Sequence, residues 1–169
     1  MVQMSQVITA NAAALVLLIM VKLHMQNQDK AGRLLDIRLL LGMMNITMLE
    51  CFFDTLVFWI DGQNFMGSRA INYAGNIIYY ILKVAIAYHW PLFIEYKINS
   101  SYERVKKLAT ILLIPLIACS LLVLSTPFHG IIFSINENNV YNRSEICFII
   151  PNLLIFIYVI IGVLKIKRK

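Results

Sequence analysis

The sequence predicts an all-α integral membrane protein, a helical bundle of five transmembrane helices with its N-terminus outside the cell and its C-terminus in the cytoplasm. Of the 169 residues, 60% are hydrophobic and only 14% are charged, whereas soluble domains have about 25% charged residues. The apolar residues form five long blocks, and about 20 apolar residues are enough to cross a bilayer. We therefore interpret residues 1–169 as a single transmembrane domain.

The transmembrane helices are expected at about residues 7–23, 39–60, 70–94, 108–124 and 146–164. No Lys or Arg precedes the first block, so we interpret it as a retained helix rather than a cleaved signal peptide, which would begin with a basic segment. A polar, basic loop then leads to the second helix. The second and third helices are joined by DGQNFMGSR, whose Gly and Asn residues are typical of turns. The third helix is followed by a polar loop, EYKINSSYERVKK.

The loop between the fourth and fifth helices is longer and reads PFHGIIFSINENNVYNRSE. Its short apolar stretch, residues 131–133, is expected at the membrane interface. Pro115 and Pro151 fall within the expected fourth and fifth helices. Because proline lacks the backbone N–H that an interior turn requires, both helices are expected to bend.

The basic residues predict the orientation. One side of the expected bundle has only Arg69 and Arg143, with Lys83 inside the third helix. The other side collects twelve bases: Lys22, Lys30, Arg33, Arg38, Lys97, Arg104, Lys106, Lys107, Lys165, Lys167, Arg168 and Lys169. The side rich in Lys and Arg is normally cytoplasmic. Charges grouped at helix ends are typical of topology signals rather than of a nucleic-acid groove, so we exclude nucleic acid as a partner.

Ionisable and amide side chains inside the second and third helices form the candidate site. Glu50 and Asp54 are four residues apart and share a helix face, as Asn76 and Lys83 nearly do on the next helix. A charge at the bilayer centre costs at least about 2.5 kcal/mol, so these groups should face inward and find partners. We predict a buried cluster in which Lys83 pairs with Glu50 or with both acids. The cluster is either a ligand, ion or proton site open to the outer side, or a structural ion pair between the two helices.

Three further side chains are secondary candidates: Asn72, His89 and Asn152. The lone histidines have no second His or Cys at ligand spacing, and the three cysteines are far apart. We therefore predict no metal site and no cofactor. The sequence also has no Gly-rich phosphate loop and no serine elbow, so we predict no catalytic residue in this chain.

Three segments carry a resemblance to a known family: the run GIIFSINENNVYNRSE, the acidic outer half of the second helix ending in FWIDG, and the EYKI segment after the third helix. Together they resemble the N-terminal membrane-sensor regions of multi-pass bacterial signalling proteins, especially those of Gram-positive gut bacteria. The resemblance implies a following cytoplasmic GGDEF diguanylate cyclase domain, or in some members a histidine kinase. In that family two more helices follow the basic loop that KIKRK represents here, and residues 1–169 contain no GGDEF or kinase motif.

The leading functional hypothesis is a sensory module in the bacterial cytoplasmic membrane. A signal from outside the cell or from the membrane would shift helix packing and be reported to the cytoplasm. The expected partners are the lipid bilayer, a small polar ligand and a second copy of the chain in a homodimer. The alternatives are a small transporter or proton-coupled carrier, which also needs ionisable residues at mid-membrane, and a structural membrane scaffold.

Overall fold

The computed structural model describes residues 2–28, 35–145 and 149–167, and it is mainly helical. In this part of the chain five helices are long and apolar enough to cross a membrane, which agrees with the sequence prediction. The elements in chain order are α1 (Val2–Gln28), α2 (Leu35–Ile60), α3 (Ser68–Asn99), α4 (Tyr102–Leu124), α5 (Thr126–His129), β1 (Phe133–Ile135), β2 (Tyr141–Arg143) and α6 (Ile149–Lys167).

The helices extend beyond the predicted limits because hydropathy marks only the apolar part of each one. The third helix, expected at residues 70–94, continues to Asn99. Backbone hydrogen bonding continues through polar residues, so a helix does not stop where its apolar block stops. The predicted fifth transmembrane helix corresponds to α6, which is described from Ile149 onward. Its predicted start at residues 146–148 lies outside the described residues. Pro151 is the third residue of α6, in the first turn, where the missing N–H has no helical partner to lose.

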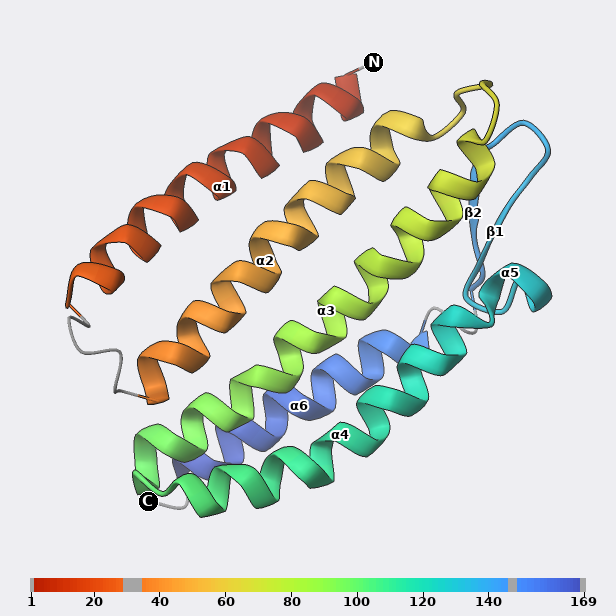
Figure 1. Cartoon of the computed structure of the whole chain (residues 1–169). Helices are drawn as coiled ribbons and strands as arrows, with labels where there is room; N and C mark the ends of the chain where they lie inside the picture. Colours follow the sequence, from red (N-terminus) through yellow and green to blue (C-terminus); the bar gives the residue numbers. More distant parts are fainter. Residues whose placement is uncertain (1, 29–34, 146–148, 168–169) are drawn as a thin grey trace.

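The helices form an irregular bundle in which α3 is central. It packs against α2 on one side and against α4 and α6 on the other, while α1 packs along α2 (Figure 1). The first residues of α1, the α2–α3 turn, α5 and both strands lie at one end of the bundle, which we call the hairpin end. The C-terminus of α6, the start of α2 and the α3–α4 connection lie at the opposite end, the basic end.

The basic side chains follow this division of the bundle. Arg69 and Arg143 belong to elements at the hairpin end. The other described bases outside the middle of α3 lie toward the basic end: Lys22, Arg38, Lys97, Arg104, Lys106, Lys107, Lys165 and Lys167. The charge asymmetry noted in the sequence is therefore a property of the folded molecule.

The predicted loop between the fourth and fifth spans contains a short helix and a β-hairpin, so the described chain is not entirely α-helical. The hairpin is antiparallel and pairs Phe133 with Arg143 and Ile135 with Tyr141. The expectation that residues 131–133 lie at the membrane interface stays a prediction, but Ile132 and Phe133 are completely buried and do not face lipid. The hairpin folds back over α3, and its apolar residues pack against that helix instead.

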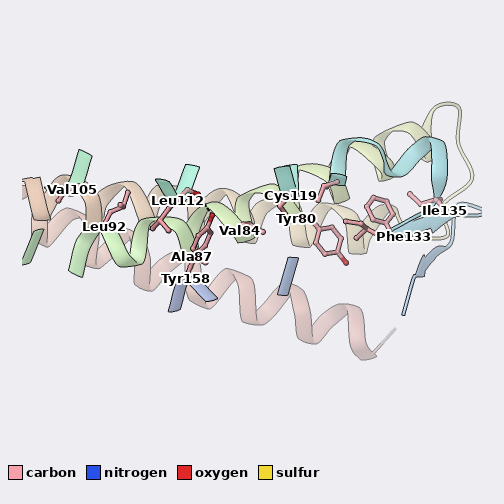
Figure 2. Close-up of a cluster of buried hydrophobic side chains, with 12 residues drawn as sticks. Tyr80, Val84, Ala87, Leu92, Val105, Leu112, Cys119, Phe133, Ile135 and Tyr158 are labelled. Carbon is pink, nitrogen blue, oxygen red and sulfur yellow. Dashed lines mark hydrogen bonds between the residues drawn. The ribbon is translucent and has the colours of Figure 1, made fainter. Parts of the chain in front are cut away.

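The buried core runs along α3. Figure 2 shows it as a row of side chains from Phe133 and Ile135 beside the hairpin to Leu92 and Val105 toward the other end of the bundle. Tyr80 stacks on Phe133 with ring centroids 5.8 Å apart. Tyr158 of α6 is completely buried, and its hydroxyl donates a hydrogen bond to the Leu112 carbonyl at 2.7 Å. The core thus ties α4, α6 and the hairpin to α3.

Two glycines permit close contacts between helices. A Cβ atom on Gly75 would lie 2.6 Å from Val57 Cγ1, and one on Gly162 would lie 2.4 Å from Trp90 Nε1. Such approaches matter in a membrane, where helix association depends on van der Waals packing because lipid removes most of the hydrophobic driving force.

Gly162→Ala is expected to destabilise the α3–α6 contact by about 1–3 kcal/mol, because the indole of Trp90 is too rigid to make room for a methyl group. The measurement is the free energy of unfolding in mixed detergent micelles. Gly42→Ala is the matched control, because a Cβ at that position meets nothing within 4 Å. Equal stability of the two variants would contradict the packing seen here.

Candidate functional site

Asn139 fixes the hairpin to the turn between α2 and α3. It has a left-handed backbone, φ 58°, and is 1% exposed. Its Nδ2 donates to the carbonyls of Ile60 at 2.8 Å and Gln63 at 2.9 Å, and its Oδ1 accepts from Asn72 Nδ2 at 3.1 Å. Sequence reasoning did not single out Asn139. The signal available was an Asn in the polar ENN turn, since Asn tolerates the left-handed conformation better than most residues.

Further hydrogen bonds hold the two strands against the helices. The Asp61 carboxylate accepts from the Tyr141 backbone N–H at 2.7 Å. On the other strand, the Ile135 N–H donates to the Tyr73 hydroxyl at 3.0 Å and the Ile135 carbonyl accepts from Arg69 Nε at 3.1 Å. The hairpin is therefore part of the folded bundle and positions its own side chains over α2 and α3.

A pocket of about 260 Å³ lies between α2, α3 and β2. It combines two carboxylates, two amides and one guanidinium with four aromatic rings. The residues that line it are Asp54, Val57, Phe58, Asp61, Asn72, Asn76, Tyr79, Tyr80, Tyr141 and Arg143. The structure thus places three of the predicted side chains, Asp54, Asn72 and Asn76, around one cavity at the hairpin end.

Glu50 and Lys83 are not among the lining residues. They lie farther from the hairpin end, one turn beyond Asp54 on α2 and one turn beyond Tyr79 on α3. The Lys83 ammonium donates to the Tyr79 hydroxyl at 2.8 Å and is 4.8 Å from the centroid of that ring. Both the Lys83 and Asp54 charges are close enough to act on the Glu50 carboxylate electrostatically.

The predicted ion pair between Lys83 and an acid is wrong. Among the described residues, the ion pairs closer than 4 Å join Lys97 to Asp36 and Lys165 to Glu95. Lys83 has a local acceptor instead, because Tyr79 is four residues earlier on the same helix face. The Tyr79 hydroxyl accepts a hydrogen bond from the Lys83 ammonium, and the Tyr79 ring attracts the cation. The Lys83 side chain therefore has its partner on α3 and does not pair with an acid of α2.

Asp54 connects the pocket to α1. Asn11 of α1 donates from Nδ2 to Asp54 Oδ2 at 2.9 Å and to Thr55 Oγ1 at 3.1 Å. Farther along the same helix pair, Lys22 Nζ donates to Asn45 Oδ1 at 2.7 Å. Asn11 could not be predicted as a site residue, because a single amide near the start of an apolar block does not indicate which residue it contacts. The first helix therefore contacts the carboxylate that lines the pocket.

The two amides on α3 differ in the hydrogen-bonding atoms that they leave available to a ligand. Asn72 is completely buried and bonded to Asn139. Asn76 is 6% exposed, and its Nδ2 donates to the carbonyl and Oδ1 of Asn72 at 3.0 and 2.8 Å. No described residue donates to Asn76 Oδ1. This amide oxygen at the pocket wall is therefore available to a ligand that donates a hydrogen bond.

The remaining secondary candidates lie away from the pocket. His89 is half-buried, and its Nδ1 bonds to the carbonyl of Ala85 on its own helix at 2.7 Å, an ordinary local contact. Asn152 is half-buried in the first turn of α6 and is not among the lining residues. Within the described ranges, no three His, Cys, Asp or Glu side chains gather closely enough to hold a metal ion.

At the basic end, charged residues tie α3 to two other helices. Glu95 is 5% exposed; it pairs with Lys165 of α6, and its Oε1 accepts from Asn99 Nδ2 at 2.8 Å. Two residues later, Lys97 pairs with Asp36 at the start of α2 at 2.8 Å. These links were not predicted from the sequence.

Comparisons of the chain with protein-family models, with curated proteins and with solved structures give no significant match.

Proposed function

We propose that the chain is a sensory module that spans the membrane five times, binds a small polar molecule at the hairpin end and transmits the binding to the basic end. The observation that carries the proposal is the pocket of about 260 Å³, which is lined by the Asp54 and Asp61 carboxylates and by an Asn76 amide oxygen that has no donor among the described residues. Polar groups are costly inside a membrane and mark ligand or ion sites there. The proposed orientation puts the hairpin end outside, since the basic end collects the Lys and Arg residues.

The central helix offers a path for the signal. α3 is a single helix of 32 residues, and its first half lines the pocket. Its second half contains Glu95 and Lys97, which bind α6 and α2 at the basic end. A ligand that prefers one packing of α2 against α3 would shift the position of α3 at both ends. Following the family resemblance, we propose a cytoplasmic diguanylate cyclase or histidine kinase as the receiver.

The sensing proposal is tested by a melting-temperature screen of the purified chain in detergent micelles with small polar metabolites. A ligand that binds the pocket is expected to raise the melting temperature in a saturable way. Asp54→Asn should weaken its affinity at least tenfold, or about 1.4 kcal/mol. Glu137→Gln is the control, because Glu137 is exposed on the hairpin and does not line the pocket. Ligands that bind Asp54→Asn and the unaltered chain equally well would place the site elsewhere.

The orientation is tested with single cysteines in a background where Cys51, Cys119 and Cys147 are replaced by Ser. A membrane-impermeant maleimide should label Glu137→Cys on intact cells, because this residue is exposed on the hairpin. Lys106→Cys, exposed near the start of α4, should react only after the cells are opened. The reverse labelling pattern would show that the hairpin end faces the cytoplasm.

One observation favours a carrier as the second candidate. The ionisable residues continue beyond the pocket toward the middle of the bundle, from Asp54 to Glu50 and Lys83. A proton-coupled carrier needs such groups along its path. Proton or solute flux into vesicles containing the purified chain, abolished by Glu50→Gln, would favour transport over sensing.

A further inference from the structure

We infer that the pocket binds a small protonated amine. This inference rests on the proposed function, because it names the chemical class of the ligand that the sensory site recognises. Three properties of the pocket lead to it: unused hydrogen-bond acceptors, aromatic walls and a net negative charge.

Three acceptor atoms in the pocket have no donor among the described residues. Asp54 uses Oδ2 for Asn11, and no described residue donates to its Oδ1. Asp61 uses Oδ1 for the Tyr141 N–H, and no described residue donates to its Oδ2. Asn76 commits its amide N–H groups to Asn72 and leaves Oδ1 open while only 6% exposed. An alkylammonium group has three donors and no acceptor, so it complements this set.

The walls of the pocket are aromatic. Four of its ten lining residues are Phe58, Tyr79, Tyr80 and Tyr141. Tyr80 and Tyr141 are held rigidly, because their hydroxyls are 2.7 Å apart and both rings pack on Phe133. An organic cation is attracted to the face of an aromatic ring, especially where water is excluded. The same walls accommodate the apolar body of an amine.

The charge of the lining favours a monocation. Asp54 and Asp61 provide two negative charges, and Arg143 provides one positive charge. No Lys, Arg or His among the described residues lies within 4 Å of either carboxylate. Outside the pocket, the formal charges of Lys83 and Glu50 cancel. One added positive charge therefore neutralises the site, whereas an anion would face two carboxylates.

The volume limits the size of the ligand. Sites for drug-sized ligands occupy about 300–1,000 Å³, and this pocket, at about 260 Å³, is below that range. A compact arylalkylamine is therefore a suitable probe, and a long or polycyclic amine is not.

The experiment measures thermal stabilisation of the full chain in detergent micelles by three probes of similar size: 2-phenylethylamine, 2-phenylethanol and 3-phenylpropionate. The amine is expected to bind saturably, at least tenfold more tightly than the alcohol or the carboxylate. Asp54→Asn and Asp61→Asn should each weaken amine binding at least tenfold, while Glu137→Gln should bind as the unaltered chain does. Both asparagine variants keep an oxygen that accepts from Asn11 or from the Tyr141 N–H, which protects their folding.

The outcomes separate this inference from the proposed function. Equal binding of the amine and the alcohol, tighter binding of the carboxylate, or amine binding that both asparagine variants retain would overturn the amine inference. If a neutral or anionic probe binds and Asp54→Asn abolishes that binding, the pocket is still a ligand site and only its assignment to amines fails. Absence of binding by all three probes also overturns the amine inference, and the metabolite screen then decides the sensory proposal.

Discussion

Replacing Lys165 with Met is expected to lower the free energy of unfolding by about 3 kcal/mol. Removing one partner of a buried ion pair leaves the other charge buried without compensation, which costs about 3–5 kcal/mol. The remaining partner is the Glu95 carboxylate, whose side chain is only 7% exposed. We place the expected loss at the lower end because Lys165 is 28% exposed and Asn99 still donates to Glu95. Unfolding by denaturant in mixed micelles measures the change.

The second ion pair on the same helix is a matched control. Lys97 pairs with Asp36 but is 63% exposed, and exposed pairs contribute only about 0–1 kcal/mol. Lys97→Met should therefore change the stability little. Adding Glu95→Gln to Lys165→Met removes the buried charge and should restore much of the lost stability. A loss that is equal in the two lysine variants, or that Glu95→Gln does not relieve, would contradict a buried ion pair between α3 and α6.

The ion pair of Lys165 also tests the proposed path of the signal. If α3 carries the movement to α6, Lys165→Met should leave ligand binding at the hairpin end nearly unchanged and reduce the response at the basic end. Ligand affinity is read from the melting-temperature shift. The response is read from the labelling rate of a cysteine placed at Lys167, the last described residue of α6.

Asn139→Ala is expected to cost about 3 kcal/mol or more and to loosen the hairpin. The substitution removes the donors to the Ile60 and Gln63 carbonyls, and a buried polar group left unpaired costs about 1–3 kcal/mol. Alanine also adopts the left-handed backbone at this position less readily than Asn does. The free energy of unfolding and the rate of proteolysis within the hairpin are the two measurements.

The neighbouring residue provides the control for this prediction. Asn138 is exposed, and its backbone N–H bonds to Asn136. Asn138→Ala should therefore stay within about 0.5 kcal/mol of the unaltered chain, as surface substitutions usually do. Because Tyr141 and Arg143 line the pocket from β2, Asn139→Ala should also abolish the ligand-induced stabilisation. Unchanged binding in this variant would show that the hairpin is not needed to form the site.

Much of the architecture could be predicted from the sequence because the relevant signals are local. A helix that crosses a membrane requires about 20 apolar residues in succession, and a run of that length is visible without any tertiary information. The cost of polar groups in a membrane predicts that Asp54 and Asn76 on adjacent spans face inward, and the structure brings both to one pocket. The separation of the basic residues to one end also follows from their positions along the chain.

The partners of individual side chains could not be predicted, because a hydrogen bond depends on placement to within a few tenths of an ångström. Lys83 was predicted to pair with an acid, but it bonds to Tyr79. Glu95 and Lys165 are 70 residues apart in sequence, and no pattern in either segment identifies the other. The hairpin could not be predicted either, since three-residue strands lack the length for a clear alternation of polar and apolar residues.

The sequence by itself thus determined five apolar helices, their order and the charge difference between the two ends of the bundle. Only the tertiary structure decided that Asn139 closes the hairpin over α2 and α3, that Asn11 contacts Asp54, and that a pocket forms beneath Tyr141. The physical reason is the distance along the chain over which each signal acts. Hydropathy and helix periodicity depend on neighbours along the chain, whereas the pocket depends on where distant backbone segments meet after folding.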